Sequence, residues 1–161
     1  MKPTLLARLS AQPAALESLL SGLTDDPLRQ RPTPDKWSIV ENLAHLGRYT
    51  DVFSERIERI LAEDKPWFDR YVADDDPGFT DWRTLTFADL IGRLDTQRAA
   101  LNTFLATLPN GSLGRVGRHP AYGPMTIEGW TEFFLLHEAH HLFTILRLGG
   151  ALRTPDQPMG A

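Results

Sequence analysis

Apolar residues recur at spacings of three and four positions along four long segments of the chain, which is the period of an α-helix. No segment shows a convincing alternation of apolar and polar positions, so the sequence predicts no β-strand. The pattern therefore predicts an all-α four-helix bundle. The four predicted helices span Thr4 to Leu23, Ser38 to Ala62, Thr86 to Leu108 and Thr126 to Gly149.

Local signals support these helix boundaries. Pro13 lies inside the first segment and predicts a kink or a restart of the helix there. Ser38 and Glu41 have the spacing of a capping box at the start of the second segment. The pair Gly149-Gly150 is a usual C-terminal stop for the fourth. The connections are about 14, 23 and 17 residues long, so we expect long crossover loops.

Length and composition indicate a single soluble domain. The chain has 161 residues, of which 42% are hydrophobic and 24% charged, as in an ordinary globular protein. We expect one helical domain over residues 1–150 and a flexible tail over residues 151–161, where proline and glycine follow the last helix.

Charge and composition also limit the partners that the protein could bind and the chemical groups that it could use. The net charge of -4 gives no electrostatic reason to expect nucleic acid or an anionic membrane. Neither a signal-peptide h-region nor a membrane-spanning run is apparent, so the expected location is cytoplasmic. The chain has no cysteine, which excludes disulfides and thiolate ligands or nucleophiles. Any catalysis must use oxygen or imidazole groups.

The segment "FFLLHEAHHLF" places three histidines in an otherwise apolar helix. His137 and His141 are four residues apart, so they lie one turn apart on the face that points into the bundle. His140 falls at the edge of that face and is the poorer ligand of the three. The alternative interpretation is that it is a half-exposed packing residue. Two buried imidazoles without partners would be costly, which makes a shared metal ion as reasonable as separate hydrogen bonds.

A third ligand must come from another segment, because zinc sites use at least three protein groups. His45 lies on the flank of the apolar stripe of the second predicted helix, at a depth that can meet the fourth. His119 lies in a loop rich in Gly and Pro, where a solvated or turn-stabilising role is the alternative. The sequence favours His45 and leaves His119 open.

Two familiar metal motifs do not fit. "HEAHH" contains the H-E-x-x-H of zinc proteases, but no suitable third ligand follows it in the chain. A di-iron bundle needs two E-x-x-H pairs, and "ENLAH" has the wrong spacing. Glu138 is a weak candidate for a catalytic base; the alternative is a carboxylate that pairs with an arginine or reaches solvent.

Three stretches together resemble the DinB/YfiT-like superfamily of four-helix-bundle metalloproteins. They are "RPTPDKWSIVENLAHL", "HPAYGPMTIEGW" and "LLHEAHHLFTIL", and the resemblance covers nearly the whole chain. It implies a divalent metal ion, zinc or nickel, bound by His45, His137 and His141. The family often has Gln two or three places after the last histidine, where this chain has Phe143 and Thr144.

The resemblance also implies a function. Similar proteins act on small molecules as metal-dependent hydrolases, isomerases or S-transferases that use a low-molecular-weight thiol. We therefore expect a metal-dependent hydrolase or thiol-dependent S-transferase, with a non-enzymatic metal-binding or ligand-binding bundle as the alternative.

The fourth predicted helix also has apolar residues away from the histidine face: Leu135, Leu136, Leu142 and Phe143. A helix that is apolar all round is buried on several sides. This surplus predicts a homodimer interface.

Overall fold

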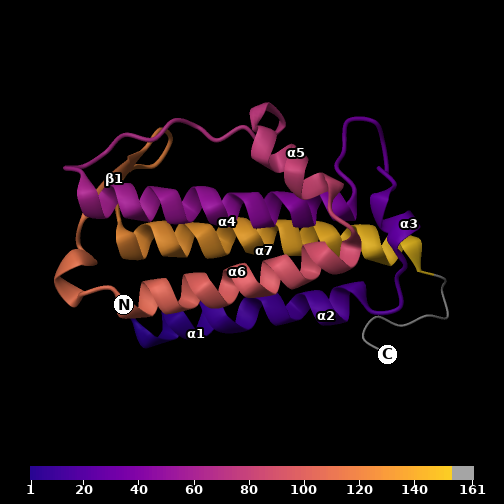
Figure 1. Cartoon of the computed structure of the whole chain (residues 1–161), viewed down its shortest axis with the longest axis horizontal. Coiled ribbons are helices and arrows are strands. Elements are labelled where there is room, and N and C mark those ends of the chain that lie inside the picture. The colour runs from indigo at the N-terminus through magenta and orange to yellow at the C-terminus, as the bar shows by residue number, and fades with distance from the viewer. Residues whose placement is uncertain (154–161) are drawn as a thin grey trace.

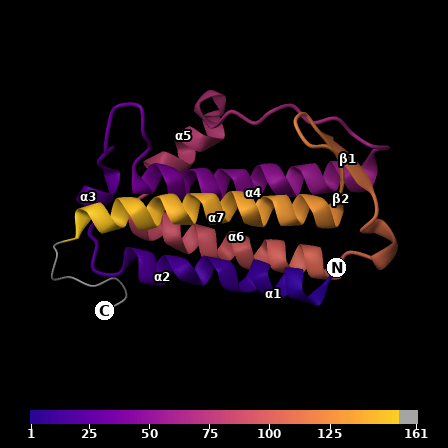
Figure 2. The ribbon, with the colours of Figure 1, turned by 180° about the vertical axis from the view of Figure 1, so that it is seen from behind.

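Four long helical segments pack side by side in a computed structural model, which describes residues 1–153. The first long segment consists of two helices in succession, α1 (Pro3–Ala11) and α2 (Ala15–Leu20). The other three segments are the single helices α4 (Ile39–Ala62), α6 (Phe87–Thr107) and α7 (Ile127–Leu152). Figures 1 and 2 show α4 and α7 side by side along their whole length. The predicted all-α four-helix bundle is confirmed. None of the helices in residues 1–153 has the length and apolarity needed to cross a membrane.

Helix ends follow the local signals in most places. A short 3₁₀ turn, η1 (Gln12–Ala14), separates α1 from α2 at Pro13, as predicted. Ser38 accepts a hydrogen bond from the Glu41 N–H while the Glu41 side chain accepts one from the Ser38 N–H, which is the expected capping box of α4. The long connections carry the short helices α3 (Asp25–Arg29) and α5 (Pro77–Thr84) and the 3₁₀ turns η2 (Ala73–Asp75) and η3 (Asn110–Ser112).

The last helix does not stop at Gly149. It continues through Gly150 to Leu152, because tertiary contacts hold its end against α2: the Arg153 guanidinium donates to the backbone carbonyls of Leu19 and Ser21. Residues 151 and 152 of the expected tail therefore belong to α7. Positions 154–161 of that tail lie outside the described residues.

A small antiparallel hairpin precedes α7, where the sequence predicted no strand. Its strands β1 (Val116–His119) and β2 (Gly123–Thr126) pair Val116 with Thr126 and His119 with Gly123. Each strand has only four residues, and they include Gly117, Gly123 and Pro124, so alternation could not reveal them. The hairpin packs on α4 and α7 at the end of the bundle where α4 finishes (Figure 1).

The core consists of two apolar clusters that meet at the middle of α4 and α7. One contains Phe53, Trp130 and Phe134, and the other contains Leu43, Trp82 and Ile145. Along α4, His45 lies between residues of one cluster and residues of the other. Along α7, the same is true of His137 and His141.

The helix α5 packs closely on α4 at Gly47. A Cβ atom at this position would overlap the Trp82 ring, so only glycine permits the contact. Trp82 is fully buried there, and its indole N–H donates to Asp51. This contact fixes the segment that carries Phe79 beside His45, at 6.1 Å between ring centroids.

The apolar surplus on α7 is split between core and surface. Leu135 and Leu142 are buried within the protomer, so they need no partner, whereas Leu136 and Phe143 are 59% and 60% exposed. The homodimer stays a prediction, now restricted to these two exposed residues.

Candidate metal centre

Three histidines from two helices converge in the interior of the bundle. His45 of α4 and His137 of α7 bring their Nε2 atoms to 3.0 Å from each other. The His141 ring lies 4.5 Å from the His45 ring and 4.7 Å from the His137 ring, measured between centroids. One ring nitrogen of each lies within 4.8 Å of the others. The structure thus brings together the three histidines that the sequence singled out.

The hydrogen bonds of Asn42 determine which nitrogen of His141 is free. The Asn42 amide nitrogen donates to the Ser38 carbonyl, so its Oδ1 atom is the acceptor that faces His141 Nδ1 at 2.8 Å. Nδ1 must therefore carry the proton, which leaves a lone pair on Nε2. Asn42 lies one turn before His45, on the same face of α4. Sequence reasoning did not single it out, although this spacing was the available signal.

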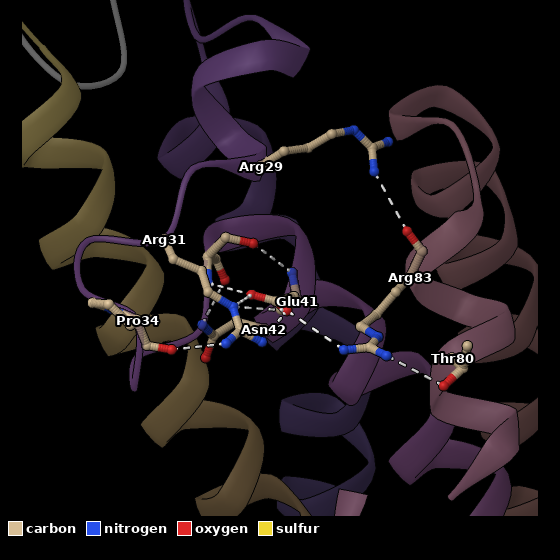
Figure 3. A network of polar contacts seen from close by, with 8 residues as sticks. Arg29, Arg31, Pro34, Glu41, Asn42, Thr80 and Arg83 are labelled. Atoms are coloured by element: carbon tan, nitrogen blue, oxygen red, sulfur yellow. Dashed lines mark hydrogen bonds and ion pairs between the residues drawn. The ribbon is translucent and has the colours of Figure 1, made fainter. Parts of the chain in front are cut away.

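A network of charged side chains holds the backbone that positions Asn42 (Figure 3). Arg31 donates from its Nε and Nη2 atoms to the Glu41 carboxylate and from Nη1 to the Pro34 carbonyl. Arg83 of α5 lies 3.6 Å from the same carboxylate. Burial raises the pKa of Glu41, but the bonds from Arg31 and the Ser38 N–H outweigh it and hold the pKa below its usual value. Glu41 is thus a structural residue at the start of α4.

Burial keeps the three imidazoles neutral at neutral pH. It lowers the pKa of His45 to about 4, although Asp74 opposes the change. Burial, reinforced by repulsion from neighbouring histidines, lowers the pKa of His137 to about 3 and that of His141 to about 2. Neutral imidazole is the form that binds a metal ion.

The donor set fits a divalent metal ion. Two nitrogens bound to one tetrahedral zinc, each at about 2.0–2.1 Å, lie roughly 3.3 Å apart, close to the spacing of His45 and His137. A direct hydrogen bond can satisfy only one pair of facing nitrogens, whereas a metal ion accepts a lone pair from each of the three rings.

A pocket of about 700 Å³ opens onto the three histidines. Tyr49 and Trp37 cover two of the rings, with centroids 4.1 Å from His137 and 5.0 Å from His45 respectively. Tyr71, from the loop between α4 and α5, stacks on the His45 ring at 5.8 Å between centroids. The pocket has the size and the largely aromatic walls of a small-molecule site.

The other candidates from the sequence have different roles. His119 ends β1, and its Nδ1 atom accepts the backbone N–H groups of Ala121 and Tyr122, so it stabilises the hairpin turn while its ring lines the pocket. His140 is exposed. Glu138 is buried and is bonded to Arg98 and Gln12, not to any of the three histidines. It thus makes the pairing with an arginine that was expected as the alternative to a catalytic base.

Replacing Asn42 with alanine is expected to weaken zinc binding by roughly 10–100-fold, the usual loss when a partner that orients a metal-binding histidine is removed. Without its acceptor, His141 is free to rotate and to place its proton on Nε2. Zinc affinity measured by calorimetry checks this. Asn102→Ala, on α6 away from the histidines, is the matched control. Equal affinity for Asn42→Ala and the unmodified protein would contradict the role.

Comparison with known proteins agrees with the fold. The sequence profile of the DinB superfamily matches residues 8–145. YuaE from Bacillus subtilis (strain 168), an uncharacterized protein, is 29% identical over 136 residues; the match covers 76% of this chain and 83% of YuaE. A solved structure of YfiT from Bacillus subtilis, described as a probable metal-dependent hydrolase with an unusual four-helix bundle topology, superposes with a TM-score of 0.77. It is 19% identical, and the match covers 94% of this chain and 90% of YfiT.

Proposed function

The chain belongs to the DinB superfamily, and from this premise we propose that it is a metal-dependent hydrolase of a small molecule. His45, His137 and His141 are the proposed ligands. Three imidazoles suit both zinc and nickel. The description of YfiT as a probable metal-dependent hydrolase supports this proposal, since the two proteins share a fold.

The convergence of the three histidines is the observation that carries the proposal. They supply three neutral nitrogen ligands from two helices, at one end of a pocket and at mutual distances that one ion can bridge. Three protein ligands with an open fourth position are characteristic of catalytic zinc sites, whereas structural sites have four protein ligands. The described residues contain no other group of three His, Cys, Asp or Glu side chains with this geometry.

A metal ion held by His45, His137 and His141 would supply Lewis-acid chemistry and would make a water nucleophile available at neutral pH. The chain's own residues prepare the site for it. Asn42 keeps the His141 proton on Nδ1, so that the lone pair available to a ligand is on Nε2. Trp37, Tyr49 and Tyr71 surround His45 and limit the access of bulk water to the histidines. All three histidines line the pocket, so the site opens to it.

Hydrolysis of a panel of esters, amides and lactones by protein purified without a histidine tag tests the proposal. Zinc- or nickel-loaded protein is expected to hydrolyse at least one compound class, to lose this activity with a chelator and to regain it when the metal is restored. Metal-loaded protein that hydrolyses nothing, or that turns over substrates only when a thiol is added, would contradict the hydrolase assignment.

A further inference from the structure

Arg56 is a buried positive charge in the wall of the same pocket. It lies on α4, eleven residues after His45, and is 8% exposed. Its guanidinium carbon lies 5.5 Å from the Phe68 ring and 5.4 Å from the Trp130 ring, measured to the centroids. Two aromatic faces therefore hold the guanidinium in place, and cation–π attraction offsets part of the cost of its burial.

No carboxylate of the described residues lies within ion-pair distance of Arg56. Its Nη2 atom donates to the Asp69 carbonyl at 2.9 Å, and Nη1 makes a long contact of 3.5 Å to the Tyr49 hydroxyl. Arg98, the other buried arginine, is instead neutralised by Glu138. Burying an unpaired charge is costly. Because the Arg56 guanidinium has only neutral partners and still has unused N–H donors, it is suited to bind an anion from outside the chain.

The charges around the pocket favour an anion at this end. Arg70 lines the rim and adds a second positive charge, while Asp74 is the one carboxylate among the lining residues that the structure describes. The charge of Asp74 acts on His45, where it opposes the lowering of the His45 pKa. The described lining residues thus carry two arginines against one carboxylate.

One tyrosine side chain spans the interval between the histidines and the Arg56 guanidinium, although their Cα atoms are further apart. Eleven residues of α-helix correspond to roughly 16 Å between the Cα atoms of His45 and Arg56. The Tyr49 side chain occupies the interval, with its ring against His137 and its hydroxyl against Arg56. His119 and Phe133 line the pocket near Trp130, so its wall at the Arg56 end is aromatic.

We propose that Arg56 binds a carboxylate on the substrate, and that the substrate is a carboxylic acid with an apolar or aromatic body whose reacting bond lies at the histidines. This inference rests on the proposed function for the reacting bond, but anion binding at Arg56 does not require the metal ion.

The binding of benzoate and of its neutral analogue benzamide to chelator-treated, metal-free protein tests the inference by calorimetry. Benzoate is expected to bind at least tenfold more tightly than benzamide. Arg56→Gln is expected to remove this preference and Arg56→Lys to retain part of it. Arg59→Gln is the matched control: Arg59 lies one turn further along α4, over the same Phe68 ring, but is paired with Glu63 and does not line the pocket.

Equal binding of benzoate and benzamide, or unchanged benzoate affinity in Arg56→Gln, would overturn the inference. If Arg56→Gln does not fold, nuclear magnetic resonance of the unmodified protein decides: benzoate must shift the Arg56 Nε–H resonance, and an unshifted resonance overturns it. Zinc affinity measured on the same preparations separates the two proposals. Tight zinc binding without a benzoate preference contradicts only the carboxylate site, and a benzoate preference without zinc binding contradicts only the metal centre.

Discussion

Replacing His137 with alanine is expected to weaken zinc binding by more than about 100-fold, beyond the loss typical of a residue that merely supports a ligand. The change removes one of the three nitrogen donors, and no other His, Cys, Asp or Glu of the described residues belongs to this group. Zinc content by elemental analysis and affinity by calorimetry, both on protein purified without a histidine tag, measure the effect.

His140→Ala is the matched control for this change. His140 is also a histidine of α7, only three residues away, but it is exposed and outside the group of three. Free zinc at 100 times the dissociation constant of the unmodified protein should stabilise that protein and His140→Ala by about 2.7 kcal/mol, and His137→Ala by no more than about 0.4 kcal/mol. Zinc affinity within tenfold of the unmodified value in His137→Ala would show that these histidines form no metal centre.

Replacing Glu138 with alanine is expected to lower the free energy of unfolding by about 3–5 kcal/mol, because it leaves the Arg98 guanidinium buried without its counter-charge. Glu138 and Arg98 are 4% and 9% exposed, and Gln12 of η1 also donates to the carboxylate. The pair thus connects α7 to α6 and to the first helical segment. Urea unfolding followed by circular dichroism measures the loss.

Zinc affinity should not change in Glu138→Ala, since none of the bonds of Glu138 reaches the three histidines. The double variant Arg98→Met with Glu138→Leu should recover most of the stability, because apolar side chains of similar size often replace a buried ion pair without loss. A tenfold loss of zinc affinity in Glu138→Ala at unchanged stability would place Glu138 in the metal centre instead of the helix interface.

Local chemistry explains why much of the fold was predictable. The capping box at Ser38 and the break at Pro13 involve residues close in sequence, so their spacing alone carries the signal. The hairpin of β1 and β2 had no such signal. Its strands are short, and contacts with distant residues hold it: the Trp130 indole N–H donates to the Gly117 carbonyl, and Phe68 packs on Trp130.

The candidate site also has a part that the sequence could predict and a part that it could not. The spacing of His137 and His141 placed both on one helix face, the position of His45 on the second predicted helix favoured it as the third ligand, and the family resemblance implied all three. The orienting role of Asn42 depends on a hydrogen bond to a residue 99 positions away in the sequence. The pairing of Glu138 with Arg98 joins residues that are 40 positions apart. Neither partner can be deduced from helical periodicity, because periodicity assigns a face and not its neighbour.

The sequence by itself determined the helical bundle, its main boundaries and the two histidines of α7, because all of these follow from spacings within one turn or one segment. Only the tertiary structure decided the rest. It brought His45 to His137, moved Glu138 into an ion pair, and left Arg56 buried in the pocket without a counter-charge. These features depend on which side chains from different helices face each other, and packing alone fixes that.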